Sequence, residues 1–166
     1  EAEENNLGDE MFYERFNRWD TCSLCKQGYH GVVHCALGWG CWKTYVRRPE
    51  GHALRCVSIG NLGNGLSGAD QHEDALTVRE THVSMLKRFD DSESNLLAVQ
   101  GNLANTYANV GRMEEALSMR REVYSGDLRI NGEEHPKTLR EASNYANTLI
   151  QLERFEEAKS VLPKMI

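Results

Sequence analysis

The chain has 166 residues, a hydrophobic fraction of 40% and a formal net charge of −6 at pH 7. This length suits one domain, or one domain with an appendage, and the acidic balance argues against general nucleic-acid binding, which needs a basic surface. No apolar run is long enough to span a membrane, and the acidic segment Glu1–Glu10 does not have the character of a signal peptide. We therefore expect an intracellular, cytoplasmic protein.

The first predicted element is a short amphipathic helix over Glu10–Trp19, whose aromatic residues recur at i, i+4 and i+7. A C-x-x-C pair, Cys22 and Cys25, follows it. The chain's five cysteines all lie in its first third, at positions 22, 25, 35, 41 and 56. Because a secreted disulfide scaffold would spread an even set of cysteines, we expect these thiols to be reduced.

The C-x-x-C pair is a candidate metal site. Two thiolates at this spacing can hold one tetrahedral Zn²⁺ from a turn, but zinc needs four ligands. The segment WDTCSLCKQGY, Trp19–Tyr29, resembles the closing segment of a RING-CH zinc domain, where a helix ending in Trp precedes the last C-x-x-C. The resemblance implies zinc as a cofactor of Cys22 and Cys25, at a site that is incomplete in this chain. It also implies a parent ubiquitin ligase whose partner is a ubiquitin-conjugating enzyme.

Other roles for these two cysteines stay open. They can simply pack, whereas a redox role is disfavoured because no βαβ pattern surrounds them. A rival metal set lies downstream, where His30 and His34 stand at i, i+4. Its members are His30, His34, Cys35 and Cys41. The structural alternative makes Cys35 a small core residue and leaves the remaining thiols incidental.

A second helix is predicted over Val32–Val46, and Pro49 ends this region because the residue before a proline is disfavoured in a helix. The broad apolar face predicted for the helix consists of Val32, Cys35, Ala36, Trp39 and Trp42. Since the end of a helical array needs covering, we expect the two tryptophans to cap the elements that follow.

The rest of the chain repeats one pattern three times. The segments starting at Asn61, Asn102 and Asn144 align at offsets of 41 and 42 residues, and the same offsets align the acidic segments starting at Glu73, Glu114 and Glu156. Two blocks that keep one register across three copies indicate a helical repeat. The predicted helices are His52–Gly68, Gln71–Arg88, Asn95–Val110, Arg112–Arg129, Pro136–Leu152 and Glu153–Met165. Gly111 occupies a turn where a left-handed backbone favours glycine.

These repeats resemble the tetratricopeptide repeat, abbreviated TPR. The matching residues are Asn-Leu-Ala, Tyr, Gly-Arg and Glu-Glu-Ala-Leu within 102–117, and Asn-Tyr-Ala and Arg-Phe-Glu-Glu-Ala within 144–158. The usual TPR period is 34 residues. The longer period here is similar to the kinesin-light-chain type, which implies a solenoid with a concave protein-binding surface. The first copy departs from the pattern, because Asp70 stands at the position equivalent to Gly111 and His72 at the position equivalent to Met113.

A polar stripe runs opposite the apolar face of each first helix, and we call it the asparagine stripe. Its predicted partner-binding residues are Asn61, Asn64, Asn102, Asn105, Asn109, Asn144, Asn147 and Gln151. Carboxamides both donate and accept hydrogen bonds without charge, and the TPR resemblance implies that they bind the main chain of an extended peptide. A solvated face and bonding between repeats are alternatives, since asparagine is not intrinsically favoured within helices. The predicted groove has no ladder of Lys or Arg.

The sequence therefore predicts an all-α protein. We expect a remnant of a RING-CH-like zinc domain over 1–30, a capping and linker helix over 31–50, and about two and a half TPR repeats over 51–166. The predicted function is a scaffold that binds a protein or extended peptide in a concave TPR groove. The alternative is a fragment of a RING-CH-type ubiquitin ligase whose repeats select substrates, and self-association is a third hypothesis. No catalytic residues are predicted in this chain, since adjacent glutamates do not face each other on a helix and no phosphate-binding loop is present.

Overall fold

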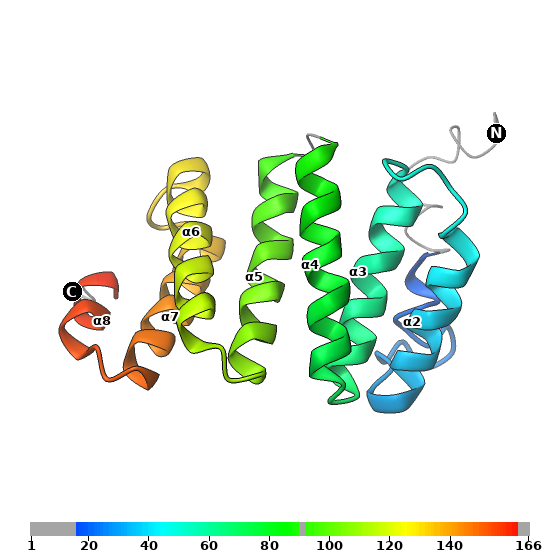
Figure 1. The fold of residues 1–166 in the computed structure, drawn as a ribbon, viewed down its shortest axis with the longest axis horizontal. Coiled ribbons are helices and arrows are strands. Elements are labelled where there is room, and N and C mark those ends of the chain that lie inside the picture. Colours follow the sequence, from blue (N-terminus) through cyan, green and yellow to red (C-terminus); the bar gives the residue numbers. More distant parts are fainter. Residues whose placement is uncertain (1–15, 90–91, 163–166) are drawn as a thin grey trace. The chain divides into compact units, whose positions relative to one another are not determined.

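The computed structural model describes residues 16–89 and 92–162. The chain divides into two compact units, unit 1 over Glu1–Ala75 and unit 2 over Leu76–Ile166. The described residues form seven α-helices that follow one another as TPR-like hairpins (Figure 1). They are α2 (Gly31–Tyr45), α3 (Ala53–Gly68), α4 (His72–Arg88), α5 (Glu93–Asn109), α6 (Met113–Asn131), α7 (Pro136–Gln151) and α8 (Phe155–Val161). The predicted all-α class is confirmed.

Helices α3, α5 and α7 begin where a side chain accepts an exposed backbone N–H. The Nδ1 atoms of His52 and His135 accept from the N–H groups of Leu54 and Lys137, each at 3.2 Å. Ser92 caps α5 through its bond from Asn95, so α5 begins two residues earlier than predicted. These bonds satisfy donors that lack a partner in the first turn of a helix. The helix predicted over Glu10–Trp19 lies outside the described residues except for its end.

The two helices of each repeat are joined by a residue in the left-handed region. Asp70, Gly111 and Glu153 have φ angles of +59°, +80° and +59°. The prediction for Gly111 is therefore confirmed. The same backbone conformation recurs at equivalent positions of the other copies, although the residues there are not glycine, so the repeat geometry overrides the local preference at those two turns.

In unit 1, α2 and α3 cross at close range through two glycines. A Cβ atom on Gly65 would lie 2.8 Å from the carbonyl oxygen of His34, and one on Gly38 would lie 3.1 Å from Cα of Leu62. The buried face of α2 accordingly consists of Cys35, Gly38 and Cys41. The broader apolar face predicted for this helix is wrong in part, because Val32 is 76% exposed and Trp39 is 42% exposed.

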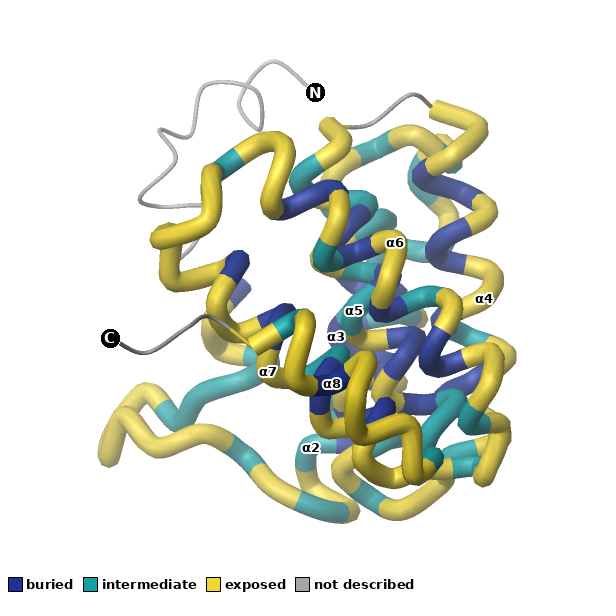
Figure 2. Tube along the Cα trace, turned by 90° about the vertical axis from the view of Figure 1, so that its left-hand side faces the viewer, coloured by how far each residue is buried: buried dark blue, intermediate teal, exposed yellow. Residues whose placement is uncertain are grey.

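Among the described residues, the core of unit 2 includes two apolar clusters, and Figure 2 shows buried positions recurring along its helices. One cluster contains Leu76, Val83 and Leu103, with Tyr107 and Val110 packed against it. The other contains Leu117, Ala146, Leu149 and Ala158. The predicted apolar stripes at Leu103 and Leu149 are thus confirmed as core.

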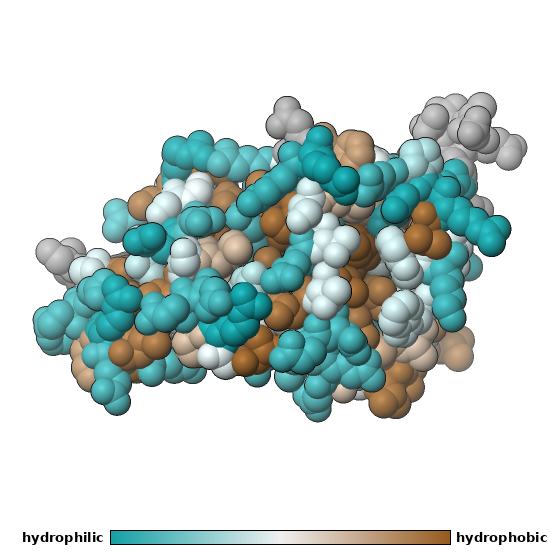
Figure 3. All heavy atoms as spheres, in the orientation of Figure 1, coloured by the Kyte–Doolittle hydropathy of each residue, from teal (hydrophilic) through white to brown (hydrophobic). Residues whose placement is uncertain are grey.

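Hydrophilic side chains dominate the face drawn in Figure 3, where hydrophobic ones appear in separated patches. Among the described residues, no helix combines the length and the apolar character needed to cross a membrane.

Candidate functional site

A polar cleft of unit 2 lies between α5, α6 and α7 and has a volume of about 320 Å³. We refer to it as the cleft. Its lining residues are Ser94, Leu97, Ala98, Gly101, Asn102, Asn105, Val123, Asp127, Lys137, Arg140, Glu141 and Asn144. The lining combines the small residues Ala98 and Gly101 with amide and charged side chains. A cleft of this size and polarity can receive a few residues of a peptide.

The structure gathers only part of the asparagine stripe at the cleft. Asn102 and Asn105 on α5 and Asn144 on α7 line it, because three-residue and four-residue spacings keep such positions on one helix face. The stripe residues that are exposed on the same helices but do not line the cleft are Asn109, Asn147 and Gln151. In unit 1, Asn64 is exposed.

Asn61 has a different environment from the other members of the stripe. It is only 4% exposed, and its carbonyl oxygen lies 3.2 Å from Nε2 of His34 in the neighbouring helix. Nε2 of His34 also lies 2.8 Å from a carboxylate oxygen of Asp20. Asn61 therefore contacts α2 within unit 1 and does not present its amide on the surface.

The cleft also contains charged residues that sequence analysis missed. Lys137 and Arg140 contribute cations, and Asp127 and Glu141 contribute carboxylates. The predicted absence of a ladder of Lys or Arg stays a prediction, because both of these cations come from one helix, α7. The signal was present in the spacing, since Lys137, Arg140 and Asn144 stand at i, i+3 and i+7 of one helix.

A buried arginine orients one of the cleft amides. Nη2 of Arg120 donates to Oδ1 of Asn105 at 2.7 Å, while Arg120 itself is only 9% exposed. Its Nε and Nη1 atoms find no hydrogen-bond partner among the described residues. Burial lowers the pKa of Arg120, and the negative charge of Glu141 acts in the opposite direction. The bond to Asn105 is thus a major anchor of this guanidinium.

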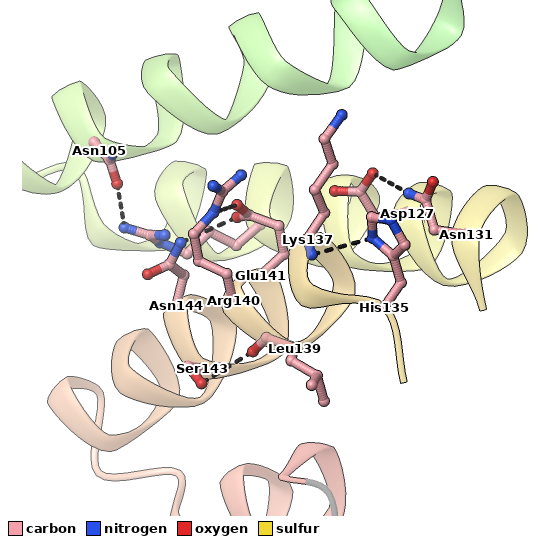
Figure 4. A network of polar contacts seen from close by, with 11 residues as sticks. Asn105, Asp127, Asn131, His135, Lys137, Leu139, Arg140, Glu141, Ser143 and Asn144 are labelled. Carbon is pink, nitrogen blue, oxygen red and sulfur yellow. Dashed lines mark hydrogen bonds and ion pairs between the residues drawn. The ribbon is translucent and has the colours of Figure 1, made fainter. Parts of the chain in front are cut away.

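A buried carboxylate orients the amide on the facing helix. Glu141 is 7% exposed, and its two oxygens accept from different residues. Nε of Arg140 donates to Oε1 at 3.0 Å, and Nδ2 of Asn144 donates to Oε2 at 3.1 Å (Figure 4). These bonds compensate for removing the carboxylate from water.

The C-x-x-C segment forms a tight turn in unit 1. The N–H of Lys26 donates to the carbonyl oxygen of Cys22 at 2.9 Å, and Thr21 and Gly28 form an isolated antiparallel bridge. Backbone N–H groups of Cys25 and Leu24, in that order of effect, stabilise the thiolate of Cys22 and lower its pKa to about 7. The turn therefore favours the charged form that a metal ion binds.

The described residues do not complete a metal site. No group of three or more His, Cys, Asp or Glu side chains within 16–89 and 92–162 is placed to hold an ion. The rival set around His30 and His34 is not formed, because α2 begins at Gly31 and His30 is an extended residue before it. Cys35 and Cys41 are buried in the core of unit 1, as the structural alternative predicted for Cys35.

Residues 95–162 match the model of the tetratricopeptide repeat family. The match gives no support to the RING-CH resemblance of the N-terminal segment. A search of curated protein sequences found no significant match.

Solved structures with the same fold carry TPR-like repeats. Two crystal structures come from a Podosopora anserina protein named as a putative kinesin light chain, with nearly identical repeats. One of them, a point variant, is 20% identical with a TM-score of 0.65, covering 76% of this chain and 61% of that chain. The other is 23% identical with a TM-score of 0.66, covering 78% and 60%. BtubC (BKLC) from P. vanneervenii is 18% identical with a TM-score of 0.63, covering 77% and 52%. The chain thus spans between about half and three fifths of each structure, and these likenesses establish its TPR-type fold.

Proposed function

We propose that the TPR repeats of unit 2 bind an extended segment of a partner protein across the cleft between α5, α6 and α7. The proposal rests mainly on one observation, the convergence of Asn102, Asn105 and Asn144 on a single cleft that also contains charged residues. TPR repeats in general are protein-interaction modules. An extended peptide exposes main-chain N–H and C=O groups that carboxamides can satisfy without requiring particular side chains.

The chain offers matched asparagines to test this proposal. We would select binders to the full chain from a random-sequence peptide library and then compare four variants. Asn102→Ala and Asn144→Ala remove cleft amides, whereas Asn109→Ala and Asn147→Ala remove amides from the same helices outside the cleft. Loss of a hydrogen bond of about 1.4 kcal/mol weakens binding about tenfold.

We expect the two cleft variants to weaken peptide binding about tenfold in titration calorimetry, and the two outer variants to bind like the original protein. Circular dichroism and thermal melting check that all four are folded. Equal losses in all four variants, or binding that no cleft substitution affects, would exclude the cleft as the peptide site.

A second candidate function follows from the C-x-x-C turn. Its thiolate-stabilising backbone N–H groups support zinc ligation by Cys22 and Cys25, with further ligands outside the described residues. In the RING-CH interpretation the parent protein would be a ubiquitin ligase, with the repeats selecting its substrates.

Zinc content separates this candidate from simple packing of the turn. Two cysteines alone bind zinc weakly, so we expect little zinc in the 166-residue chain and tight zinc in a longer protein that carries the remaining ligands. Cys22→Ser should abolish that tight zinc and any ubiquitin-chain formation with a conjugating enzyme, whereas Cys56→Ser should affect neither. Tight zinc in the shorter chain itself would contradict the incomplete-site hypothesis.

A further inference from the structure

The two amides that face each other across the cleft are held in opposite orientations. A guanidinium group has hydrogen-bond donors only, so Asn105 must turn its carbonyl oxygen toward Arg120, as the 2.7 Å bond shows. The NH₂ group of Asn105 is therefore directed away from Arg120. The chemistry of the partner decides this orientation, whatever convention is used to assign amide atoms.

Asn144 is oriented the other way by the same reasoning. A carboxylate only accepts hydrogen bonds, so Asn144 must turn its NH₂ group toward Glu141, at 3.1 Å. Its carbonyl oxygen is then directed away from Glu141. Arg140 occupies the other carboxylate oxygen, which leaves the Asn144 amide as the partner of Oε2.

Burial makes both orientations persistent. Arg120 and Glu141 are 9% and 7% exposed, and charge-assisted bonds strengthen where water is excluded. Rotating the Asn105 amide by half a turn would place its NH₂ group against the guanidinium of Arg120, where donor would meet donor. Rotating the Asn144 amide would place its carbonyl oxygen against the carboxylate of Glu141, where acceptor would meet acceptor. Figure 4 shows Asn105 bonded to the guanidinium and Asn144 bonded to Glu141. These two cleft-lining residues therefore retain a donor on α5 and an acceptor on α7.

We infer that Arg120 and Glu141 are positioning residues that make the cleft select a main-chain peptide group through both its C=O and its N–H. This inference rests on the function proposed above. The C=O of a bound segment accepts from Asn105, and an N–H of the segment donates to Asn144. A carboxylate satisfies only the first position, because it has no hydrogen to donate to Asn144.

The first measurement tests the orientation without a ligand. In the 166-residue chain labelled with ¹³C and ¹⁵N, scalar couplings across hydrogen bonds identify each donor and acceptor. We expect couplings from Nη2 of Arg120 to the Asn105 carboxamide carbon and from Nδ2 of Asn144 to the Glu141 carboxyl carbon. Glu141→Gln should shift the side-chain amide protons of Asn144, and Glu134→Gln, at an exposed loop residue, should leave them in place. Unchanged Asn144 signals in Glu141→Gln would overturn the inference.

The second measurement tests the consequence for binding. A peptide selected from the random-sequence library is resynthesised with each backbone amide replaced in turn by an ester, which removes one N–H donor. We expect one ester to weaken binding to the original protein about tenfold. In Glu141→Gln, Asn144 can rotate its NH₂ group outward and no longer needs the N–H of the peptide. The affinity loss caused by this ester should therefore fall below about threefold in Glu141→Gln. In Glu134→Gln the same ester should still weaken binding about tenfold. An identical ester profile in Glu141→Gln would overturn the inference.

The two failures are distinguishable. If Asn102→Ala and Asn144→Ala bind every selected peptide as tightly as the original protein, the proposed function is wrong. The peptide selection inferred from that function is then wrong as well. The scalar couplings would still report the orientations of the two amides. If peptides do require the cleft asparagines but no ester depends on Glu141, the proposed function stands and the inference is wrong.

Discussion

At the residue scale, the turns between paired helices place a residue in the left-handed backbone region, which strains any residue except glycine. Gly111 and Glu153 occupy equivalent left-handed positions, with φ angles of +80° and +59°. A Cβ on Gly111 would meet nothing within 4 Å, so backbone strain alone opposes a side chain there. We expect Gly111→Ala to lower the free energy of unfolding by about 1 kcal/mol and Glu153→Gly to raise it by up to about 1 kcal/mol, as measured by urea denaturation.

Glu134→Gly is the matched control for Glu153→Gly, because Glu134 is an exposed loop residue whose φ is not positive. Glycine at that position only adds freedom to the unfolded chain and should lower stability by roughly 0.5–1 kcal/mol. If Glu153→Gly destabilised the protein as much as Glu134→Gly, strain at this turn would be insignificant.

Also at the residue scale, the cysteines should differ in reactivity. Backbone N–H groups lower the pKa of Cys22 to about 7, whereas burial raises the pKa of Cys41 to about 12. In metal-free protein, we expect the alkylation rate of Cys22 by iodoacetamide to rise with a midpoint near pH 7, and Cys41 to remain unmodified until the chain unfolds. Peptide mass spectrometry after timed labelling measures both rates.

The sign of the linked stability follows from the same shift. The folded chain stabilises the Cys22 thiolate, so this contribution is present above the unfolded pKa of about 8.5. It is lost as the pH falls through about 7. In urea, the alkylation midpoint of Cys22 should move up to about 8.5, and an unchanged midpoint would show that the turn has no influence on this thiol.

At the element scale, the crossing of α2 and α3 depends on Gly65. A Cβ there would lie 2.8 Å from the His34 carbonyl oxygen and 2.9 Å from Cα of Cys35. Both are backbone atoms of α2, so the two helices would have to separate. We expect Gly65→Ala to lower the free energy of unfolding by about 1–3 kcal/mol, as measured by denaturant titration followed by circular dichroism.

Gly68→Ala provides the control on the same helix, because its nearest atom outside the local chain would be His34 Nδ1 at an ordinary 3.9 Å. We expect this variant to match or slightly exceed the original stability. Because alanine favours a helix more than glycine does, a loss at position 68 as large as at position 65 would mean that close approach to α2 does not explain the loss at position 65.

At the scale of the whole molecule, the two compact units predict separable local stability. Interactions in repeat arrays fall mainly between neighbouring elements, so a local defect should spread little. We expect Gly65→Ala to accelerate hydrogen exchange in α2 and α3 and to leave α5, α6 and α7 unchanged, as followed by mass spectrometry of peptic fragments.

The reciprocal variant is Leu149→Ala in unit 2. Leu149 is fully buried beside Leu117, Ala146 and Ala158, and its truncation should cost about 2–5 kcal/mol. Exchange should then rise in α6, α7 and α8 and stay unchanged in α2 and α3. Uniform acceleration over both units by either variant would show that the chain unfolds as one cooperative body.

Local pattern alone was enough to predict the helices and their repeat register. The apolar stripes at Leu103 and Leu149, the turn at Gly111 and the start of α7 at Pro136 all follow from neighbours within a few residues. The apolar face of α2 was partly mispredicted, because the glycine contacts in the α2–α3 crossing place Cys35, Gly38 and Cys41 inside and leave Val32 outside.

Some features of the candidate site could likewise be predicted from the sequence and others could not. The recurrence of asparagines on one face of each first helix follows from the sequence, because helical spacing depends only on the chain's own geometry. The burial of Asn61 against His34 depends on how the helices pack, as does the position of Asn105 and Asn144 at one cleft. Their orientation by Arg120 and Glu141 also requires the packed structure. The burial and the charged partner of a side chain depend on which helix lies opposite, and that is a property of the packed molecule.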